Sequence, residues 1–193
     1  MATPRIEGFL PNRLDVDRSV WVAPGSVIVG DVTVGRRSSI WYGCVLRGDL
    51  EPVVIGEETN IQDLTLVHVD VDRPAIVGNR VSIGHRCVLH GCTIEDEALV
   101  GMGSVLLNGC RIGRGAVVAA GSVIREGFIV PEGRIAAGVP ATLKGEVAPE
   151  LKQRVLFGIG NYMDVAVLYR KGALGGGKFG GAGANNDESG AGS

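Results

Sequence analysis

The sequence predicts a repetitive all-β fold followed by one C-terminal α-helix. Branched apolar residues recur every six positions over more than a hundred residues, as in "VIVGDVTVGRRSSIWYGC" at 27–44. The chain has 31 glycines and only 5% aromatic residues, which suits tight turns around an interior of Val, Ile, Leu and Ala. After residue 148 the apolar spacing changes to three or four, which is typical of a helix.

The six-residue period resembles the hexapeptide repeat of left-handed parallel β-helices, in which about 18 residues make one triangular coil. A single coil cannot bury its apolar side, but stacked coils form a continuous core. We therefore expect a β-helix domain over residues 1–147, with small inward residues such as Cys44, Cys87 and Cys110 four places after an apolar one. The apolar series comprises Val22, Ile28, Val34, Ile40, Leu46, Ile55, Ile61, Val67, Val77, Ile83, Leu89, Ile94, Val100, Leu106, Ile112, Val118, Ile124 and Val130.

The period is interrupted in three places. Three extra residues lie between Leu46 and Ile55, four lie between Val67 and Val77, and the step from Leu89 to Ile94 is one residue short. Insertions of this kind project from one face of a repeat protein, and that face is often the one that binds. The two insertions are therefore candidates for a functional face.

The C-terminal region changes character twice. Pro149 suits the first turn of a helix, which we expect over residues 148–171 and packed along the β-helix. Residues 172–193 are rich in Gly, Ala and Asn, and we expect a disordered tail because they offer too little apolar surface. The apolar stripe of the helix comprises Leu151, Val155, Ile159, Tyr162, Ala166 and Tyr169.

Charge and targeting signals exclude several classes of partner. The formal charge is −2, from 19 basic and 21 acidic residues, so nucleic acid and membrane are not expected partners. No apolar stretch approaches a signal sequence or a membrane span of about 18 residues. The four cysteines lack CxxC spacing. We expect a cytoplasmic protein with free thiols.

All three histidines of the chain lie in one short window, residues 65–91. His68 and His90 are 22 residues apart, which equals one coil plus the four-residue insertion, so they should stack on adjacent rungs about 4.8 Å apart. Arg47 falls in the same column. Two imidazoles in this position suit one metal ion, so we interpret His68, His85 and His90 as its ligands.

His85 belongs to a neighbouring column, above Asp63, and should point in another direction. A cyclic oligomer resolves this divergence, because His85 of one subunit can complete the site of the next. Three-fold symmetry suits a triangular prism. The register alone therefore leads to the hypothesis of a metal site shared by two chains.

The motifs "RGDLEPVVIGEETNIQD" at 47–63 and "GHRCVLHG" at 84–91, together with His68, resemble those of the γ-class carbonic anhydrases. The resemblance covers roughly residues 8–170. It implies a homotrimer that hydrates CO2 reversibly to bicarbonate and a proton, using hydroxide bound to zinc, with iron or cobalt as alternative metals. It also implies roles beside the metal for six further residues: Gln62, Arg47, Asp49, Asn60, Asp63 and Tyr162.

The insertion after His68, "VDVDRP", is short, and all three histidines are assigned to the metal. No imidazole is left to shuttle protons, so we expect activity that is modest or dependent on external buffer. Two other functions stay open at this stage. One is a CoA-dependent acyltransferase with a histidine base and no metal. The other is a metal-binding or assembly subunit with little catalysis.

Overall fold

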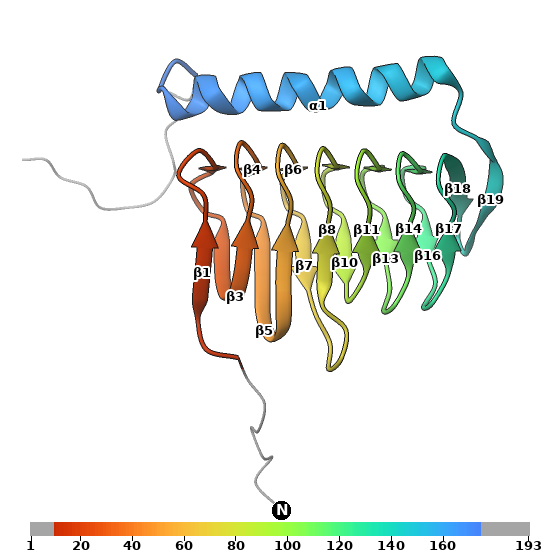
Figure 1. Cartoon of the computed structure of the whole chain (residues 1–193), viewed down its shortest axis with the longest axis horizontal. Helices are drawn as coiled ribbons and strands as arrows, with labels where there is room; N and C mark the ends of the chain where they lie inside the picture. The colour runs from red at the N-terminus through yellow and green to blue at the C-terminus, as the bar shows by residue number, and fades with distance from the viewer. Residues whose placement is uncertain (1–9, 175–193) are drawn as a thin grey trace, which may run out of the picture.

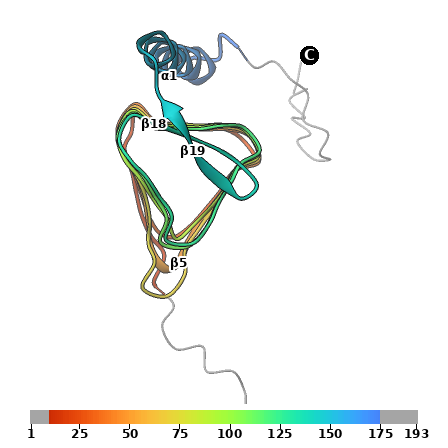
Figure 2. The ribbon, with the colours of Figure 1, turned by 90° about the vertical axis from the view of Figure 1, so that its right-hand side faces the viewer.

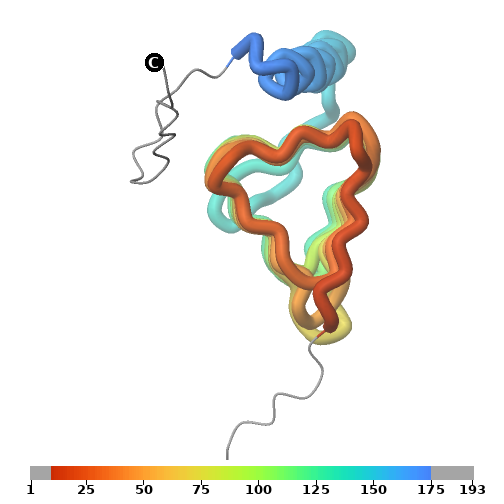
Figure 3. Tube along the Cα trace, turned by 90° about the vertical axis from the view of Figure 1, so that its left-hand side faces the viewer, coloured from red at the N-terminus to blue at the C-terminus, as the bar shows by residue number. Residues whose placement is uncertain are grey.

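The computed structural model describes residues 10–174, which wind into a left-handed β-helix. Viewed along its axis, the helix is a triangular prism whose coils superpose closely (Figures 2 and 3). The strands of this prism form two hydrogen-bonded sheets, of 11 and 8 strands within the described part of the chain. The all-β prediction with a C-terminal helix is therefore confirmed.

The larger sheet supplies two faces of the prism and the smaller sheet supplies the third (Figure 1). The strands of the larger sheet are β1 (Arg13–Val16), β3 (Val27–Val34), β5 (Val45–Ile55), β7 (Leu66–His68), β8 (Ala75–Val77), β10 (Val88–His90), β11 (Thr93–Ile94), β13 (Val105–Leu106), β14 (Arg111–Ile112), β16 (Val123–Ile124) and β17 (Ile129–Val130). Those of the smaller sheet are β2 (Trp21–Val22), β4 (Ser39–Ile40), β6 (Asn60–Ile61), β9 (Ser82–Ile83), β12 (Leu99–Val100), β15 (Val117–Val118), β18 (Arg134–Gly138) and β19 (Ala141–Glu146).

The periodic apolar residues form three columns inside the prism. One column runs through β4, β6, β9 and β12 in strict register, as Ile40, Ile61, Ile83 and Val100. All four of these side chains are fully buried. Parallel pairing at one-coil spacing puts like residues above one another, so each rung completes the burial of its neighbours.

Small residues line the corners, where the chain turns most tightly. Ser38, Thr59 and Thr65 are buried there. Each hydroxyl donates to a glycine carbonyl about one coil further along the chain. The acceptors are Gly56 for Ser38 at 2.7 Å, Gly78 for Thr59 at 2.8 Å and Gly84 for Thr65 at 3.1 Å. Cys44 and Cys87 occupy equivalent corners and are also buried. The expectation that these cysteines are inward packing residues is confirmed.

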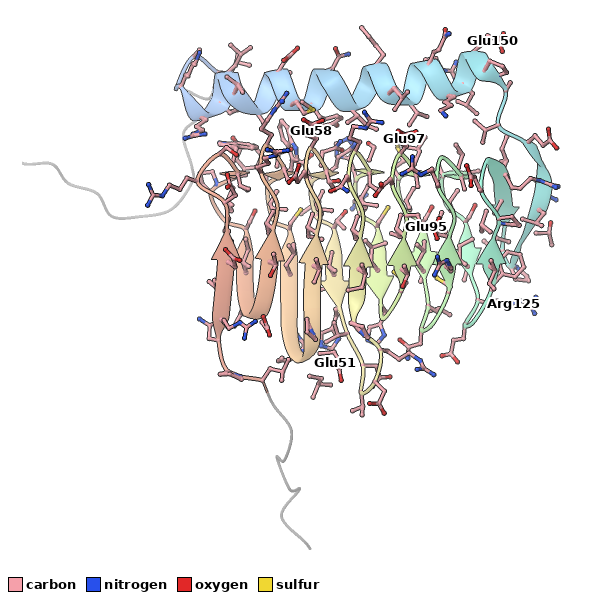
Figure 4. The ribbon with its side chains drawn as sticks, in the orientation of Figure 1. Glu51, Glu58, Glu95, Glu97, Arg125 and Glu150 are labelled. Atoms are coloured by element: carbon pink, nitrogen blue, oxygen red, sulfur yellow. The ribbon has the colours of Figure 1, made fainter. Side chains whose placement is uncertain are left out.

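The first insertion makes β5 an 11-residue strand that turns a corner without interruption. Glycines permit the close approach of β3 to β5 there. A Cβ atom on Gly30, whose φ is +89°, would lie 2.2 Å from the carbonyl oxygen of Gly48, and one on Gly48 would lie 2.3 Å from that of Asp31. The two strands can therefore approach this closely only because Gly30 and Gly48 lack side chains. The second insertion projects beside Glu51, at the corner opposite the helix (Figure 4).

Helix α1 (Pro149–Arg170) lies along the outer side of the smaller sheet and runs back toward β2 (Figure 1). Val155, Ile159 and Ala166 are its buried residues. Toward its C-terminal end, Tyr169 stacks on Trp21, with ring centroids 4.9 Å apart. The predicted helix and its apolar stripe are thus observed.

The last strand of the prism differs from a continuous repeat. Strand β19 pairs antiparallel with β18, so the last strand closes the prism as a hairpin instead of adding a rung. The predicted Gly-rich tail, apart from residues 172–174, lies outside the described residues, as do the first nine residues of the predicted β-helix domain. None of the helices among residues 10–174 is long and apolar enough to cross a membrane.

Candidate metal centre

His68 and His90 lie side by side at the ends of adjacent strands. β7 and β10 pair in register, with His68 opposite His90, as their 22-residue separation predicts. Nδ1 of His68 is 3.2 Å from Nε2 of His90, and the ring centroids are 5.1 Å apart. The two imidazoles therefore direct one nitrogen each at a common point.

The second nitrogen of His68 is held by a carboxylate. Nε2 of His68 is 3.0 Å from Oδ1 of Asp49, and Oδ2 of Asp49 accepts a hydrogen bond of 2.5 Å from Arg47. Burial by itself raises the pKa of Asp49, but the hydrogen bonds from Arg47 and His68 outweigh it and hold that pKa below its usual value. Asp49 is thus an acceptor that fixes the orientation of His68.

The second nitrogen of His90 is held by an amide that the sequence analysis missed. Nδ1 of His90 is 2.6 Å from Oδ1 of Asn108, and Nδ2 of Asn108 donates to Asp70 at 2.8 Å. The register did not point to it directly, because Leu89 pairs with Leu106, 17 residues further on, so Asn108 lies one place beyond the residue in line with His90. Asp70 belongs to the second insertion, so that insertion contacts the histidine pair through Asn108.

These partners determine which nitrogens carry protons. A carboxylate only accepts, so His68 presents Nε2–H to Asp49 and keeps the lone pair on Nδ1. Asp70 likewise orients the Asn108 amide, whose oxygen then accepts Nδ1–H of His90 and leaves the lone pair on Nε2. Both lone pairs converge across the 3.2 Å gap, where they repel unless a proton or a metal ion lies between them.

His85 lies apart from this pair, at the corner that follows β9. Its Nδ1 is 2.8 Å from Oδ2 of Asp63, one rung below, as the register predicted. Its Nε2 is 3.4 Å from the hydroxyl of Tyr162 on α1. Tyr162 also packs edge-on against Trp41, with centroids 5.1 Å apart, so it both packs in the helix stripe and approaches a predicted site residue.

A cavity of about 490 Å³ opens beside His85, between the corner and α1. Its lining is largely aromatic and includes Trp41, Tyr42, Tyr162 and Tyr169, with Asp63 below. Burial, and then the charge of Asp63, raise the pKa of Tyr162, so its hydroxyl is a neutral hydrogen-bonding group. The cavity gives His85 a sheltered but accessible setting.

Gln62 and Asn60 form a buried polar network under the helix. Nε2 of Gln62 donates to Oδ1 of Asn60 at 2.9 Å and to Ser82 at 3.2 Å. This leaves Oε1 of Gln62 as its acceptor toward any further group. Nδ2 of Asn60 is the one buried side-chain polar atom in the described region without a partner.

The predicted site residues thus form two groups in one chain. His68, Arg47 and Asp49 lie near one edge of the face built by β3, β5, β7, β10, β13 and β16, with His90. His85, Asp63 and Tyr162 lie at the opposite edge, next to the Gln62–Asn60 network. Within residues 10–174, no three His, Cys, Asp or Glu side chains are close enough to hold one metal ion.

Comparisons with known proteins agree with this architecture. The family model "Bacterial transferase hexapeptide (six repeats)" matches residues 91–126. Over 98 residues the chain is 55% identical to "Gamma carbonic anhydrase 1, mitochondrial" of Arabidopsis thaliana, covering 48% of this chain and 36% of that protein. Over 91 residues it is 50% identical to "Probable carbonic anhydrase" of Methanocaldococcus jannaschii, covering 47% and 57%. A solved structure of a putative acetyltransferase from Bacillus cereus superposes with a TM-score of 0.82 at 35% identity, covering 84% and 96%.

The fold and its repeat define a hexapeptide-repeat protein with a left-handed β-helix. Within that class, the chain belongs to the γ-class carbonic anhydrase family. The alignments cover 36% of the Arabidopsis relative and 57% of the Methanocaldococcus relative, so only part of each relative is matched.

Proposed function

We propose that the chain is a metal-dependent carbonic anhydrase that hydrates CO2 reversibly at a site shared by two subunits of a homotrimer. The observation that carries the proposal is the convergence of His68 Nδ1 and His90 Nε2 at 3.2 Å. Two nitrogens that bind one tetrahedral zinc ion at about 2.0–2.1 Å are separated by about 3.3–3.4 Å. The pair therefore fits zinc without rearrangement, and iron or cobalt are alternatives for the same imidazole set.

The position of His85 supports a metal site that is shared between two chains. His85 has its Nδ1 anchored by Asp63, in the way that metal-binding histidines are usually anchored, but it faces away from the pair in its own chain. A heterologous ring brings the His85 edge of one subunit to the His68–His90 edge of the next. The three imidazoles would then come from two chains, with one site for each subunit.

An uncovered apolar column on the face between the two edges supports the same assembly. The column runs in strict register through β3, β5, β7, β10, β13 and β16, and its side chains point outward. Val27 is 50% exposed and Leu66 is 36% exposed. Apolar patches that stay uncovered in one chain mark interaction surfaces. The members of this column, called the apolar ridge below, are Val27, Val45, Leu66, Val88, Val105 and Val123.

The chain's own residues supply binding and orientation for the reaction. When bound, the metal ion would supply the Lewis-acid chemistry that activates water for attack on CO2. Gln62 has its amide nitrogen engaged by Asn60 and Ser82, so its Oε1 accepts a hydrogen bond from a reacting water. Arg47 keeps guanidinium donors beyond its bond to Asp49, and these attract bicarbonate near the histidine pair.

An acyltransferase is the second candidate, and one arrangement favours it. The His85–Asp63 pair, with 2.8 Å between Nδ1 and Oδ2, is a carboxylate-supported imidazole beside a cavity of about 490 Å³. Such a pair suits a general base. The structural similarity to a putative acetyltransferase points the same way. This reaction would need no metal.

Metal analysis combined with a CO2 hydration assay on one sample tests the proposal. The protein is purified without oxygen, its zinc, iron and cobalt are measured, and stopped-flow hydration is recorded before and after chelation. We expect one metal ion per chain and activity that disappears and returns with the metal. Acetyl transfer from acetyl-CoA that resists chelation would favour the acyltransferase. Bound metal without hydration would favour the metal-binding or assembly subunit. A cytoplasmic location stays a prediction from composition.

A further inference from the structure

We propose that Asn108 is a positioning residue that sets the tautomer of His90, and that Asp70 in turn orients Asn108. The inference rests on the proposed function, because it concerns how the chain prepares a metal-binding nitrogen. It assigns a purpose to the second insertion, residues 69–74, which the proposed reaction leaves without one.

The contacts form a directed chain from the insertion to the metal-facing nitrogen. Asp70 accepts from Nδ2 of Asn108 at 2.8 Å, and Oδ1 of Asn108 lies 2.6 Å from Nδ1 of His90. An amide that faces a carboxylate must present its NH2 group, so its oxygen is the atom left for His90. His90 then carries its proton on Nδ1, and Nε2 keeps the lone pair that a metal needs. Without Asn108 the proton could move to Nε2, where it would donate to His68.

The insertion is built to keep Asp70 in place. Asp70 and Arg73 exchange two backbone hydrogen bonds, of 3.1 Å and 2.9 Å, which close the loop into a tight turn. The carboxylate also accepts from the backbone N–H of Val71 at 2.9 Å. The acceptor that orients Asn108 therefore belongs to a closed turn, and its direction is set before any ligand arrives.

The backbone directly after His90 also makes room for Asn108. Gly91 follows His90 with φ +54°, and a Cβ atom there would lie 2.7 Å from Oδ1 of Asn108 and 2.9 Å from Cβ of Arg73. A side chain at position 91 would thus push against the amide oxygen that holds His90. The absence of a side chain at Gly91 preserves the short Asn108–His90 contact.

Two substitutions of Asn108 separate its acceptor role from mere anchoring of the loop. Asn108→Leu removes the acceptor for His90 and the donor to Asp70. Asn108→Asp keeps an acceptor for His90 but places a second carboxylate against Asp70. Long-range ¹H–¹⁵N spectra of the metal-free protein report which nitrogen of each histidine is protonated, and with three histidines they can be assigned by His→Gln variants. Zinc affinity is measured by competition with a chromophoric chelator.

We expect wild-type His90 to be protonated on Nδ1, and Asn108→Leu to populate the Nε2–H form and weaken zinc binding about 10–100-fold. Asn108→Asp should keep the Nδ1–H form and bind zinc more tightly than Asn108→Leu. An unchanged tautomer in Asn108→Leu, or equal losses in both variants, would overturn the proposal. If wild-type protein binds no metal, the proposed function fails, whereas the tautomer measurement still tests Asn108.

Asp70→Asn tests the outer member of the chain, with Asp72→Asn as its matched control. Both remove one negative charge from the same turn, but no side-chain hydrogen bond links Asp72 to Asn108, and its φ of +58° is one that Asn tolerates. Zinc affinity should fall in Asp70→Asn and stay at the wild-type value in Asp72→Asn. Equal affinity in the two variants would remove Asp70 from the proposal.

Discussion

His68 and His90 face each other on adjacent rungs, with Nδ1 and Nε2 3.2 Å apart. His85 of the same chain is bound to Asp63, at the other edge of the same face. One chain therefore carries two complementary half-sites that it cannot join by itself. This arrangement leads to several measurements that do not depend on knowing the native metal.

Mixing two inactive variants should restore activity. His68→Gln damages the paired half-site and His85→Gln damages the other, so each homotrimer should lack hydration activity and tightly bound metal. In a mixed trimer, an intact pair can meet an intact His85 of the neighbouring chain. Each mixed trimer has one intact site of its three, so doubly tagged trimers should recover about one third of the wild-type sites. The variants are coexpressed with different tags, purified by both tags in sequence, and assayed.

The control for this experiment is a mixture of His68→Gln with His90→Gln, which damage the same half-site and should not complement. Recovery in the control mixture, or none in the test mixture, would contradict a site shared between subunits.

A charge on the apolar ridge should dissociate the assembly. Leu66→Glu puts a carboxylate at the centre of the proposed interface, where burial without a partner is costly. Ile129→Glu is the matched control, because Ile129 is 60% exposed on a different face of the prism. Sedimentation equilibrium should report a monomer without metal for Leu66→Glu, and a metal-containing trimer for Ile129→Glu. A monomeric wild type that retains metal would refute the shared site.

CO2 hydration should accelerate with buffer concentration. The backbone N–H of Val71, and then Asn108, lower the pKa of Asp70 from its ordinary value, so this carboxylate is an even weaker proton acceptor at neutral pH. No histidine is left outside the proposed ligand set. Stopped-flow rates measured at constant ionic strength in increasing imidazole should rise and then level off. A fast rate that ignores buffer would show that an internal shuttle exists.

Replacing Gly30 by Ala should destabilise the fold and loosen the site together. The added Cβ atom would lie 2.2 Å from the carbonyl oxygen of Gly48, between Arg47 and Asp49. Gly115→Ala is the control, because Gly115 also has a positive φ, of +60°, but no atom lies within 4 Å of its added Cβ. We expect a loss of about 3 kcal/mol for Gly30→Ala and about 1 kcal/mol for Gly115→Ala, from denaturant unfolding. Equal losses of stability in the two variants would mean that the positive φ at Gly30 matters and its close contact with Gly48 does not.

The cysteine thiols should not react with reagents in the native protein, and ionisation of Cys44 should destabilise the fold at alkaline pH. Burial raises the pKa of the Cys44 thiol from 9.0 to about 11. Dithionitrobenzoate at pH 8 should label none of the four buried thiols until denaturant is added. The pKa of Cys44 is higher in the folded protein than in the unfolded one. The neutral Cys44 thiol therefore contributes its full stability below pH 9, and this contribution is lost as the pH rises to 11. The denaturation midpoint should therefore fall less steeply over that range in Cys44→Ala than in wild type.

Much of the site follows from counting residues along the chain. Inward apolar columns, the His68–His90 stack and the position of His85 above Asp63 all follow from a fixed coil length plus two insertions. The same counting would have missed Asn108, because the coil from Leu89 to Leu106 has 17 residues and Asn108 lies one place beyond the residue in line with His90. The closing β18–β19 hairpin could not be predicted, because its antiparallel pairing departs from the repeat.

By itself, then, the sequence determined the rung on which each side chain sits, because a stacked repeat converts spacing in the chain directly into neighbours in space. Only the tertiary structure decided which nitrogen of each imidazole meets Asp49, Asn108 or Tyr162, and which outer face α1 covers. Those outcomes depend on side-chain direction and on how distant elements pack. Periodicity predicts which side chains face inward, but it fixes neither the rotamer of an outward side chain nor the packing of distant elements.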